Sequence, residues 1–190
     1  MSILKIARMG HPVLRKKSEE ISDPQSEYVK YLVEDMLETL EDIQGLGLAA
    51  PQVHVSKKLV IFYSPPGEAE TSEMDLNILI NPIIEPIGDD IDYDWEGCLS
   101  VPGLRGLVPR YKKIRYKGLN EKGKKIDKTV EGLHARVVQH ECDHLEGIIY
   151  VQRMDNLEDL VFESEMKFYN KFHHEVPCSK NLNLIYWLSN

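Results

Sequence analysis

The chemistry of this chain is indicated first by two histidines four residues apart, in the segment His140-Glu141-Cys142-Asp143-His144. On an α-helix, residues i and i+4 lie on one face, so both imidazoles can reach a single metal ion. Glu141 lies about 100° round the helix from His140, close enough to act on a water beside that ion without binding the ion itself. A catalytic metal usually takes three protein ligands and keeps one position for water, so the third ligand decides the chemistry.

Three kinds of residue are candidates for that third ligand. The histidine that metzincin-type zinc enzymes place six residues after the second histidine is absent, because this position is Tyr150. A downstream glutamate, as in thermolysin-like enzymes, is available as Glu158, Glu163 or Glu165, and an upstream thiolate is available as Cys98. The residues alone leave the glutamates and the cysteine open.

Three segments together resemble the motifs of the peptide deformylases. They are Gly45-Leu46-Gly47-Leu48-Ala49-Ala50-Pro51-Gln52, Glu96-Gly97-Cys98-Leu99-Ser100 and Gln139-His140-Glu141-Cys142-Asp143-His144-Leu145-Glu146-Gly147, in the family's order. The resemblance runs from about Ile6 to the helix after Met154, and Leu46 departs mildly from the isoleucine or valine that is common there. It implies a metal-dependent hydrolase that removes the N-formyl group from the N-terminal methionine of new polypeptides and releases formate.

The resemblance also implies the ligands and the catalytic residues. The metal would be held by Cys98, His140 and His144, with Glu141 as the general base that passes its proton to the departing amine. The side-chain amide of Gln52 and the backbone N–H of Leu99 would stabilise the tetrahedral oxyanion. A thiolate with two imidazoles suits Zn²⁺, Fe²⁺, Co²⁺ or Ni²⁺, and the family commonly uses Fe²⁺, which is the implied native metal.

Substrate contacts are implied in the same way. The backbone of Gly47 would pair with the extended peptide, which fits a residue without a side chain. Leu133, Arg136 and Val137 would form the wall that receives the methionine side chain, and helical spacing places all three on the histidine side. Val138, Cys142, Leu145 and Ile149 form an apolar stripe on the opposite side. Arg105 would contact the substrate, although a surface ion pair is an equal alternative for both arginines.

Composition limits the class of protein. With 190 residues, 42% of them hydrophobic, we expect residues 1–190 to form one catalytic domain with its own core. No apolar run is long enough to span a bilayer and no signal peptide precedes the fold, so a cytoplasmic protein without a membrane partner is expected. The three cysteines sit in dissimilar contexts and indicate no disulfide framework.

Charge is unevenly distributed along the chain. The net charge is −8, yet residues 105–128 carry ten basic residues against Glu121 and Asp127. An acidic chain argues against DNA binding, whereas this basic band predicts either ribosome contact through RNA or a solvated face of a β-ribbon.

The elements form an α+β pattern. We expect one helix from Ser22 or Asp23 to Gly45, strands at 58–63, 77–84, 105–120 and 124–131, an acidic loop at 89–94, and a bulge or edge at Pro82. A second helix is predicted over 157–172, capped by Asp155 or Asn156, and an apolar strand or docked tail at 184–188. The predicted architecture is a single compact domain with antiparallel or mixed strands around a central metal-binding helix.

Two rival functions remain at this point. A thermolysin-type endopeptidase using Glu163 or Glu165 leaves Cys98 and the Gly45–Gln52 motif unexplained. A structural-zinc module with an RNA-facing ribbon needs a fourth protein ligand, and no nearby residue is an obvious candidate.

Overall fold

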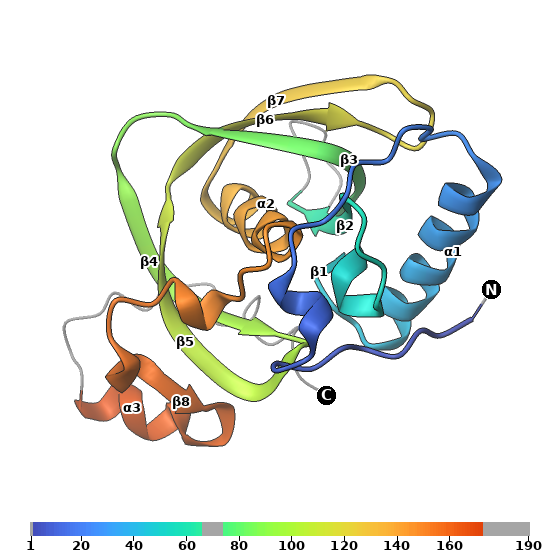
Figure 1. Cartoon of the computed structure of the whole chain (residues 1–190). Coiled ribbons are helices and arrows are strands. Elements are labelled where there is room, and N and C mark those ends of the chain that lie inside the picture. Colours follow the sequence, from blue (N-terminus) through green and yellow to red (C-terminus); the bar gives the residue numbers. More distant parts are fainter. Residues whose placement is uncertain (1, 66–73, 173–190) are drawn as a thin grey trace.

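The computed structural model describes residues 2–65 and 74–172 (Figure 1). Its first long element is helix α1 (Glu27–Asp42). Ser26 caps this helix, because its side chain accepts a hydrogen bond from the backbone N–H of Val29 and so satisfies one donor left free at the helix N-terminus. The helix therefore begins later than the predicted start at Ser22 or Asp23.

A five-stranded antiparallel sheet holds most of the backbone. Its strands, in spatial order, are β1 (Gly47–Ala49), β2 (Leu59–Ser64), β3 (Asp75–Pro86), β6 (Lys113–Leu119) and β7 (Lys125–Glu131). The predicted bulge near Pro82 is confirmed, since the pairing register between β3 and β6 shifts between Ile80 and Ile83. Asn81 adopts a φ of 50° there, and its side chain pairs with both backbone groups of Ile21.

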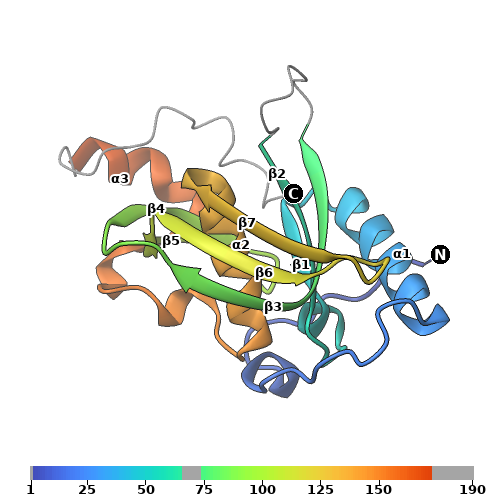
Figure 2. The same cartoon turned by 90° about the horizontal axis from the view of Figure 1, so that it is seen from above.

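A second antiparallel sheet contains β4 (Ile91–Cys98), β5 (Val101–Tyr111) and β8 (Leu160–Phe162), in the order β4-β5-β8. Leu99 and Ser100 form the tight connection between β4 and β5. Figures 1 and 2 show α1 at one end of the molecule and α3 (Met166–Phe172), beside β8 in the chain, at the other.

Helix α2 (Gly132–Leu145) lies among the strands at the centre of the molecule (Figure 1). Every residue from Ala135 to Leu145 is buried, so the helix is covered on both flanks. The predicted apolar stripe does pack into a core, where Val138, Cys142 and Leu145 meet Val60 of β2. The prediction of a central metal-bearing helix in an α+β domain is confirmed.

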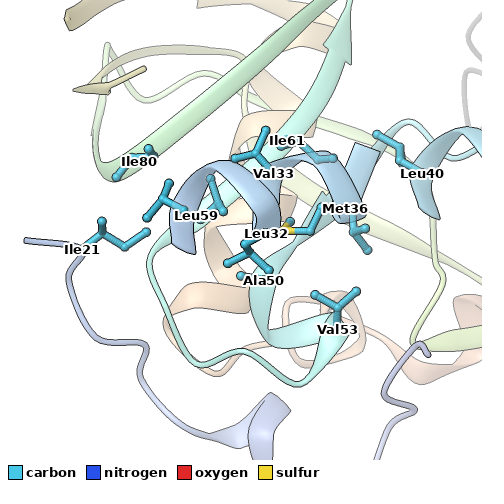
Figure 3. Close-up of a cluster of buried hydrophobic side chains, with 12 residues drawn as sticks. Ile21, Leu32, Val33, Met36, Leu40, Ala50, Val53, Leu59, Ile61 and Ile80 are labelled. Atoms are coloured by element: carbon cyan, nitrogen blue, oxygen red, sulfur yellow. The ribbon is translucent and has the colours of Figure 1, made fainter. Parts of the chain in front are cut away.

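Helix α1 covers the opposite face of β2. Figure 3 shows Leu32, Val33, Met36 and Leu40 of α1 packed with Ile61 and other buried side chains. Burying side chains of this size contributes roughly 1.5–3 kcal/mol each. Strands β1 and β2 are therefore held between two helices, and this packing fixes the backbone of the Gly45–Gln52 motif beside α2.

Several sequence-based predictions of elements need correction. The strand predicted over 105–120 is two strands, β5 and β6, which turn at Lys112 and belong to different sheets. The acidic segment 89–94 is only partly a loop, because Asp92 and Asp94 lie within β4.

The long helix predicted over 157–172 is also wrong. Asn156 does accept a hydrogen bond from the backbone N–H of Glu158, but it caps only a single 3₁₀ turn, Leu157–Asp159. The chain then extends as β8 because β5 offers an edge, with Leu104 opposite Phe162 and Gly106 opposite Leu160. A second 3₁₀ turn, Glu163–Glu165, precedes α3.

The predicted apolar strand at 184–188 lies outside the described residues, so the single domain over residues 1–190 stays a prediction. Among the described residues, no helix combines the length and the apolar character needed to cross a membrane.

Candidate metal centre and active site

The end of β4 and the middle of α2 bring three metal-binding side chains together. Cys98, His140 and His144 are all buried, and one ligand atom from each lies within 4.8 Å of the others. His144 Nε2 is 3.3 Å from Cys98 Sγ. Metal–sulfur and metal–nitrogen distances of about 2.3 Å and 2.0 Å place two ligand atoms on a tetrahedral ion roughly 3.5 Å apart. The donor set and its spacing therefore fit one divalent cation.

The downstream glutamates do not join this group. Glu163 forms an ion pair with Arg105 at 2.9 Å, and Glu158 lies in the turn capped by Asn156. Cys98, His140 and His144 form the one group of metal-ligating side chains identified within the described ranges. The cysteine is thus the third ligand that the geometry supports.

Glu96 sets the orientation of His140, and the sequence analysis assigned it no role. Its Oε2 lies 2.8 Å from His140 Nδ1, so Nδ1 donates and Nε2 keeps its lone pair for a metal. Burial alone would raise the pKa of Glu96, but the charge of Arg110 and hydrogen bonds from His140 and Arg110 hold that pKa well below its usual range. Glu96 lies two residues before Cys98 in the same motif, and this proximity was the signal available in the sequence; the pairing register of β4 with β5 shifts between the two residues.

Two arginines complete the environment of Glu96. Arg110 is bidentate, with Nε and Nη2 each 2.9 Å from the carboxylate oxygens. Arg136 Nη1 donates to Glu96 Oε1 at 2.8 Å and to the carbonyl of Val108 at 2.9 Å. Four N–H donors therefore converge on one buried carboxylate, and each oxygen accepts two of them.

The network continues behind the metal ligands. Arg110 Nη1 donates to Asp143 Oδ2 at 2.5 Å, and Arg153 donates to both oxygens of Asp143 at 2.7 and 3.0 Å. Asp143 belongs to α2 and immediately precedes His144. This chain of ion pairs ties α2 to β5 and to the segment after the helix, and it was not foreseen from the sequence.

Glu141 faces β1. A Cβ on Gly47 would collide with the Glu141 carboxylate, so the absence of a side chain at Gly47 makes room for the acid. Burial raises the pKa of Glu141 to about 7. Its Oε2 has no hydrogen-bond partner among the residues that the structure describes. A buried carboxylate with a free oxygen beside three metal-ligating atoms is suited to proton transfer.

The two predicted oxyanion groups belong to segments next to the ligand Cys98. The side-chain Oε1 of Gln52 accepts a hydrogen bond from the backbone N–H of Ala49 at 2.8 Å, which turns the side-chain Nε2 towards Cys98 Sγ at 3.5 Å and Ser100 Oγ at 3.3 Å. Leu99 directly follows Cys98, so its backbone N–H belongs to the turn between β4 and β5.

The predicted substrate-binding residues are more dispersed. Leu133 and Val137 pack in the core cluster next to β1 and β2, whereas the Arg136 guanidinium points to β4 and β5 through Glu96 and Asp92. Arg105 is 2% exposed, and a Cβ on Gly97 would collide with its guanidinium. The structure thus places Arg105 in an internal ion pair beside the Glu96–Ser100 motif.

Comparison with known proteins agrees with this site. The polypeptide deformylase family profile matches residues 3–159. Peptide deformylase 1 of Nitrosomonas europaea is 44% identical over 154 residues, which cover 80% of this chain and 88% of that protein. Peptide deformylase 1 of Prochlorococcus marinus is 42% identical over 170 residues, covering 88% of each chain.

A solved structure shows the same fold. The class I type b peptide deformylase of Acinetobacter baumannii superimposes with a TM-score of 0.75 at 35% identity, covering 81% of this chain and 100% of that one. Another structure of that enzyme, bound to Met-Ala-Ser, has a TM-score of 0.73 at 34% identity and covers 80% of this chain and 98% of that one. The chain belongs to the polypeptide deformylase family, a family of metal-dependent hydrolases that remove the N-formyl group from nascent peptides.

Proposed function

We propose that this deformylase holds one divalent cation, Fe²⁺ in the native enzyme, between Cys98, His140 and His144. The observation that carries the proposal is the meeting of a thiolate from β4 with two imidazoles from α2. This donor set also accepts Zn²⁺, Co²⁺ or Ni²⁺. When bound, the cation supplies Lewis-acid activation of water and of the formyl carbonyl at neutral pH.

Glu141 is the general base of the proposed reaction. Its free Oε2 takes a proton from the attacking water, and the same oxygen then delivers that proton to the departing amine of methionine. Burial raises the pKa of the Glu141 carboxyl above the usual range of a glutamate, which helps this group to act as an acid as well as a base. Gly47 leaves room for the carboxylate in this position, because a side chain there would collide with it.

The oxyanion is stabilised by two donors. The Gln52 amide is fixed through its bond to Ala49, so its N–H groups need no reorientation during the reaction. The Leu99 N–H belongs to the loop that carries Cys98. Donors that are fixed before the reaction favour the transition state over the substrate, and losing one typically lowers kcat about 10²–10³-fold.

The peptide binds along β1. This strand pairs with β2 on one side and is an edge of its sheet, so its other side can pair with an extended substrate. Gly47 supplies backbone groups for this pairing, and Leu133 and Val137 receive the methionine side chain. The Arg136 guanidinium donates hydrogen bonds to Glu96 and Asp92, so only the methylene groups of its side chain can contact the methionine. The Arg105 guanidinium packs against Gly97 and forms an ion pair with Glu163, so it supports the Glu96–Ser100 motif from inside the protein.

The test is formate release from a formyl-methionyl peptide by protein prepared without oxygen, with metal analysis of the same sample. Cys98→Ser should lower both the metal content and the rate sharply, because a hydroxyl is a much poorer ligand than a thiolate. Glu163→Ala serves as the control for the thermolysin-type alternative and should retain its metal. A Cys98→Ser protein with undiminished metal content would refute the ligand assignment.

Formyl-methionyl chains are made where translation starts with formyl-methionine. We therefore propose a cytoplasmic enzyme that meets the nascent chain at the ribosome. Four basic side chains of the band are already buried or paired within the protein. Arg105 and Arg110 are buried, and Arg115 and Lys117 pair with Asp127 and Glu85.

Within the band we assign the RNA contact to the β6–β7 turn, where Lys122, Lys124 and Lys125 are exposed close together in the chain; Lys112 and Lys128 are exposed elsewhere on the band. Reversing these three charges to glutamate should weaken co-sedimentation with ribosomes and reduce its salt dependence. Unaltered co-sedimentation would show that the turn is only a solvated surface.

A further inference from the structure

A cavity lies next to the active-site loop, and the mechanism above does not use it. Its volume is about 910 Å³, and it is bounded by the N-terminal segment, by Ile43 after helix α1, by His54 and by the Leu99–Gly103 region. Four of its lining residues are basic: Lys5, Arg8, His11 and His54. We call this cavity the N-terminal cleft.

The charge of the N-terminal cleft has one sign. Among the described residues that line it there is no aspartate or glutamate, and the ion pairs formed within the same part of the chain include neither Lys5 nor Arg8. Burial, and then the charges of His11 and Lys5, lower the pKa of His54. A net acidic protein therefore concentrates positive charge at this place, without a carboxylate among the described lining residues.

The two histidines add donors to the same wall. Their rings pack edge to face with centroids 4.6 Å apart. His11 Nδ1 accepts the backbone N–H of Val13 at 3.2 Å, so the neutral His11 ring carries its proton on Nε2. Side-chain N–H groups of lysine, arginine and histidine are the donors that bind carboxylates.

The N-terminal cleft is joined to the catalytic loops by backbone hydrogen bonds. Ala7 donates to the carbonyl of Gln52 and Met9 donates to the carbonyl of Ser100, both at 2.7 Å. Lys5 and Arg8 are carried by this same segment. Leu99 lines the cleft with its side chain while its backbone lies in the proposed oxyanion loop.

The path of the substrate leads to this cleft. In a peptide that pairs antiparallel to β1, the formyl-methionine lies near Gly47. The residues that follow the methionine then run past Gly45 towards Ile43. Ile43 lines the cleft, and a Cβ on Gly45 would lie 3.5 Å from Leu99 Cδ1. An extended chain advances about 3.3 Å per residue, so side chains one to three residues beyond the methionine come to this region.

We infer that the N-terminal cleft is a carboxylate subsite, which makes the enzyme favour nascent chains with aspartate or glutamate at the second, third or fourth position. This inference rests on the proposed function, because it needs the peptide to run along β1. Lys5 and Arg8 attract the carboxylate, and His11 and His54 donate hydrogen bonds to it. They are specificity residues and take no part in bond breaking.

The experiment measures kcat/KM for C-terminally amidated formyl-Met peptides that carry one aspartate at position two, three or four, each against its asparagine and lysine counterparts. At low ionic strength, one position should show aspartate favoured over asparagine by about 5–10-fold, a size expected of two partly exposed charge pairs. The preference should shrink at high salt. Formyl-Met-Ala-Ser with a free carboxylate, compared with its amide, shows whether a terminal carboxylate uses the same subsite.

Substitution separates the subsite from the reaction itself. Lys5→Gln/Arg8→Gln should abolish the aspartate preference and leave turnover of the asparagine peptides unchanged. Lys16→Gln/Lys30→Gln removes the same charge from two exposed residues outside the cleft and should keep the preference. Equal kcat/KM for aspartate and asparagine at all three positions would overturn the inference, as would a preference that survives Lys5→Gln/Arg8→Gln. Failure of the proposed function appears differently, as no formate from any peptide.

Discussion

Replacing Glu96 by glutamine tests the environment of the metal ligands more directly than any change to a ligand. The carboxylate accepts four N–H donors: Arg110 Nε and Arg136 Nη1 on Oε1, and Arg110 Nη2 and His140 Nδ1 on Oε2. Glutamine must put its NH₂ on one of these two sides. In either orientation that NH₂ meets two donors, since an arginine cannot be deprotonated in a protein.

The two orientations fail in different ways. With the NH₂ on the Oε1 side, two guanidinium donors lose their acceptor. With the NH₂ on the Oε2 side, His140 can respond only by moving its proton to Nε2, and that tautomer cannot bind the metal. In both cases Glu96→Gln removes the carboxylate that Arg110 binds through two bonds, and Asp143 is then its remaining buried partner.

The expected sizes follow from burial. The Glu96 and Arg110 side chains are 5% and 4% exposed, and removing one partner of a buried pair typically costs about 3–5 kcal/mol of stability. Loss of the group that orients a metal-binding histidine typically weakens metal affinity about 10–100-fold. Asp127→Asn is the matched control, because Asp127 also binds an arginine through two bonds of 2.7 Å, but both side chains are 45–47% exposed. That change should stay within about 1 kcal/mol.

Two measurements suffice: urea unfolding with the metal present at a fixed free concentration, and competition for the metal against a chelator. Glu96→Gln should lose stability and metal affinity, and Asp127→Asn should lose neither. If Glu96→Gln binds metal as tightly as the parent, the assignment of Glu96 as the orienting group is wrong.

Three further predictions follow from the same structure. Glu141→Gln should keep the metal and the fold but release formate about 10²–10⁴-fold more slowly, so a near-parent rate at equal metal occupancy would exclude Glu141 as the base. Gly47→Ala should also slow formate release, because its methyl group displaces the Glu141 carboxylate, while circular dichroism should show an unchanged fold. Burial chiefly lowers the pKa of His134 to about 4, so its neutral form is favoured on folding. The stability that comes from burying neutral His134 is fully present above about pH 6.5. It is lost as the pH falls towards 4, because the unfolded chain binds the proton first. The stability of His134→Gln should therefore depend less steeply on pH than that of the parent in this window, and equal slopes in urea titrations would contradict the prediction.

The ligand set was accessible from the sequence because its signals are local. The i, i+4 spacing of His140 and His144 follows from helix geometry alone, and Cys98 became the third ligand only through the motif around it. The structure brings these residues together as predicted. The strands β2 and β3 were predicted from short apolar runs for the same reason, and the edge or bulge in β3 was predicted from Pro82.

The parts that could not be predicted depend on contacts between distant segments. The residues after Asn156 have a composition typical of a helix, yet Leu160–Phe162 forms a strand because β5 supplies an edge. Likewise Arg110 looked like part of a basic surface, whereas the fold turns it inward to Glu96 and Asp143. No local pattern in the chain distinguishes a buried arginine of this kind from an exposed one.

The hydrogen bonds from Ala7 and Met9 to the catalytic loops have a consequence for how the enzyme matures. The beginning of the chain is synthesised first, but its partners at Gln52 and Ser100 emerge much later, and His144 later still. Pairings between segments so far apart form only when the chain as a whole collapses. Metal capture is therefore expected to be a late event in folding, after the end of β4 and helix α2 have come together.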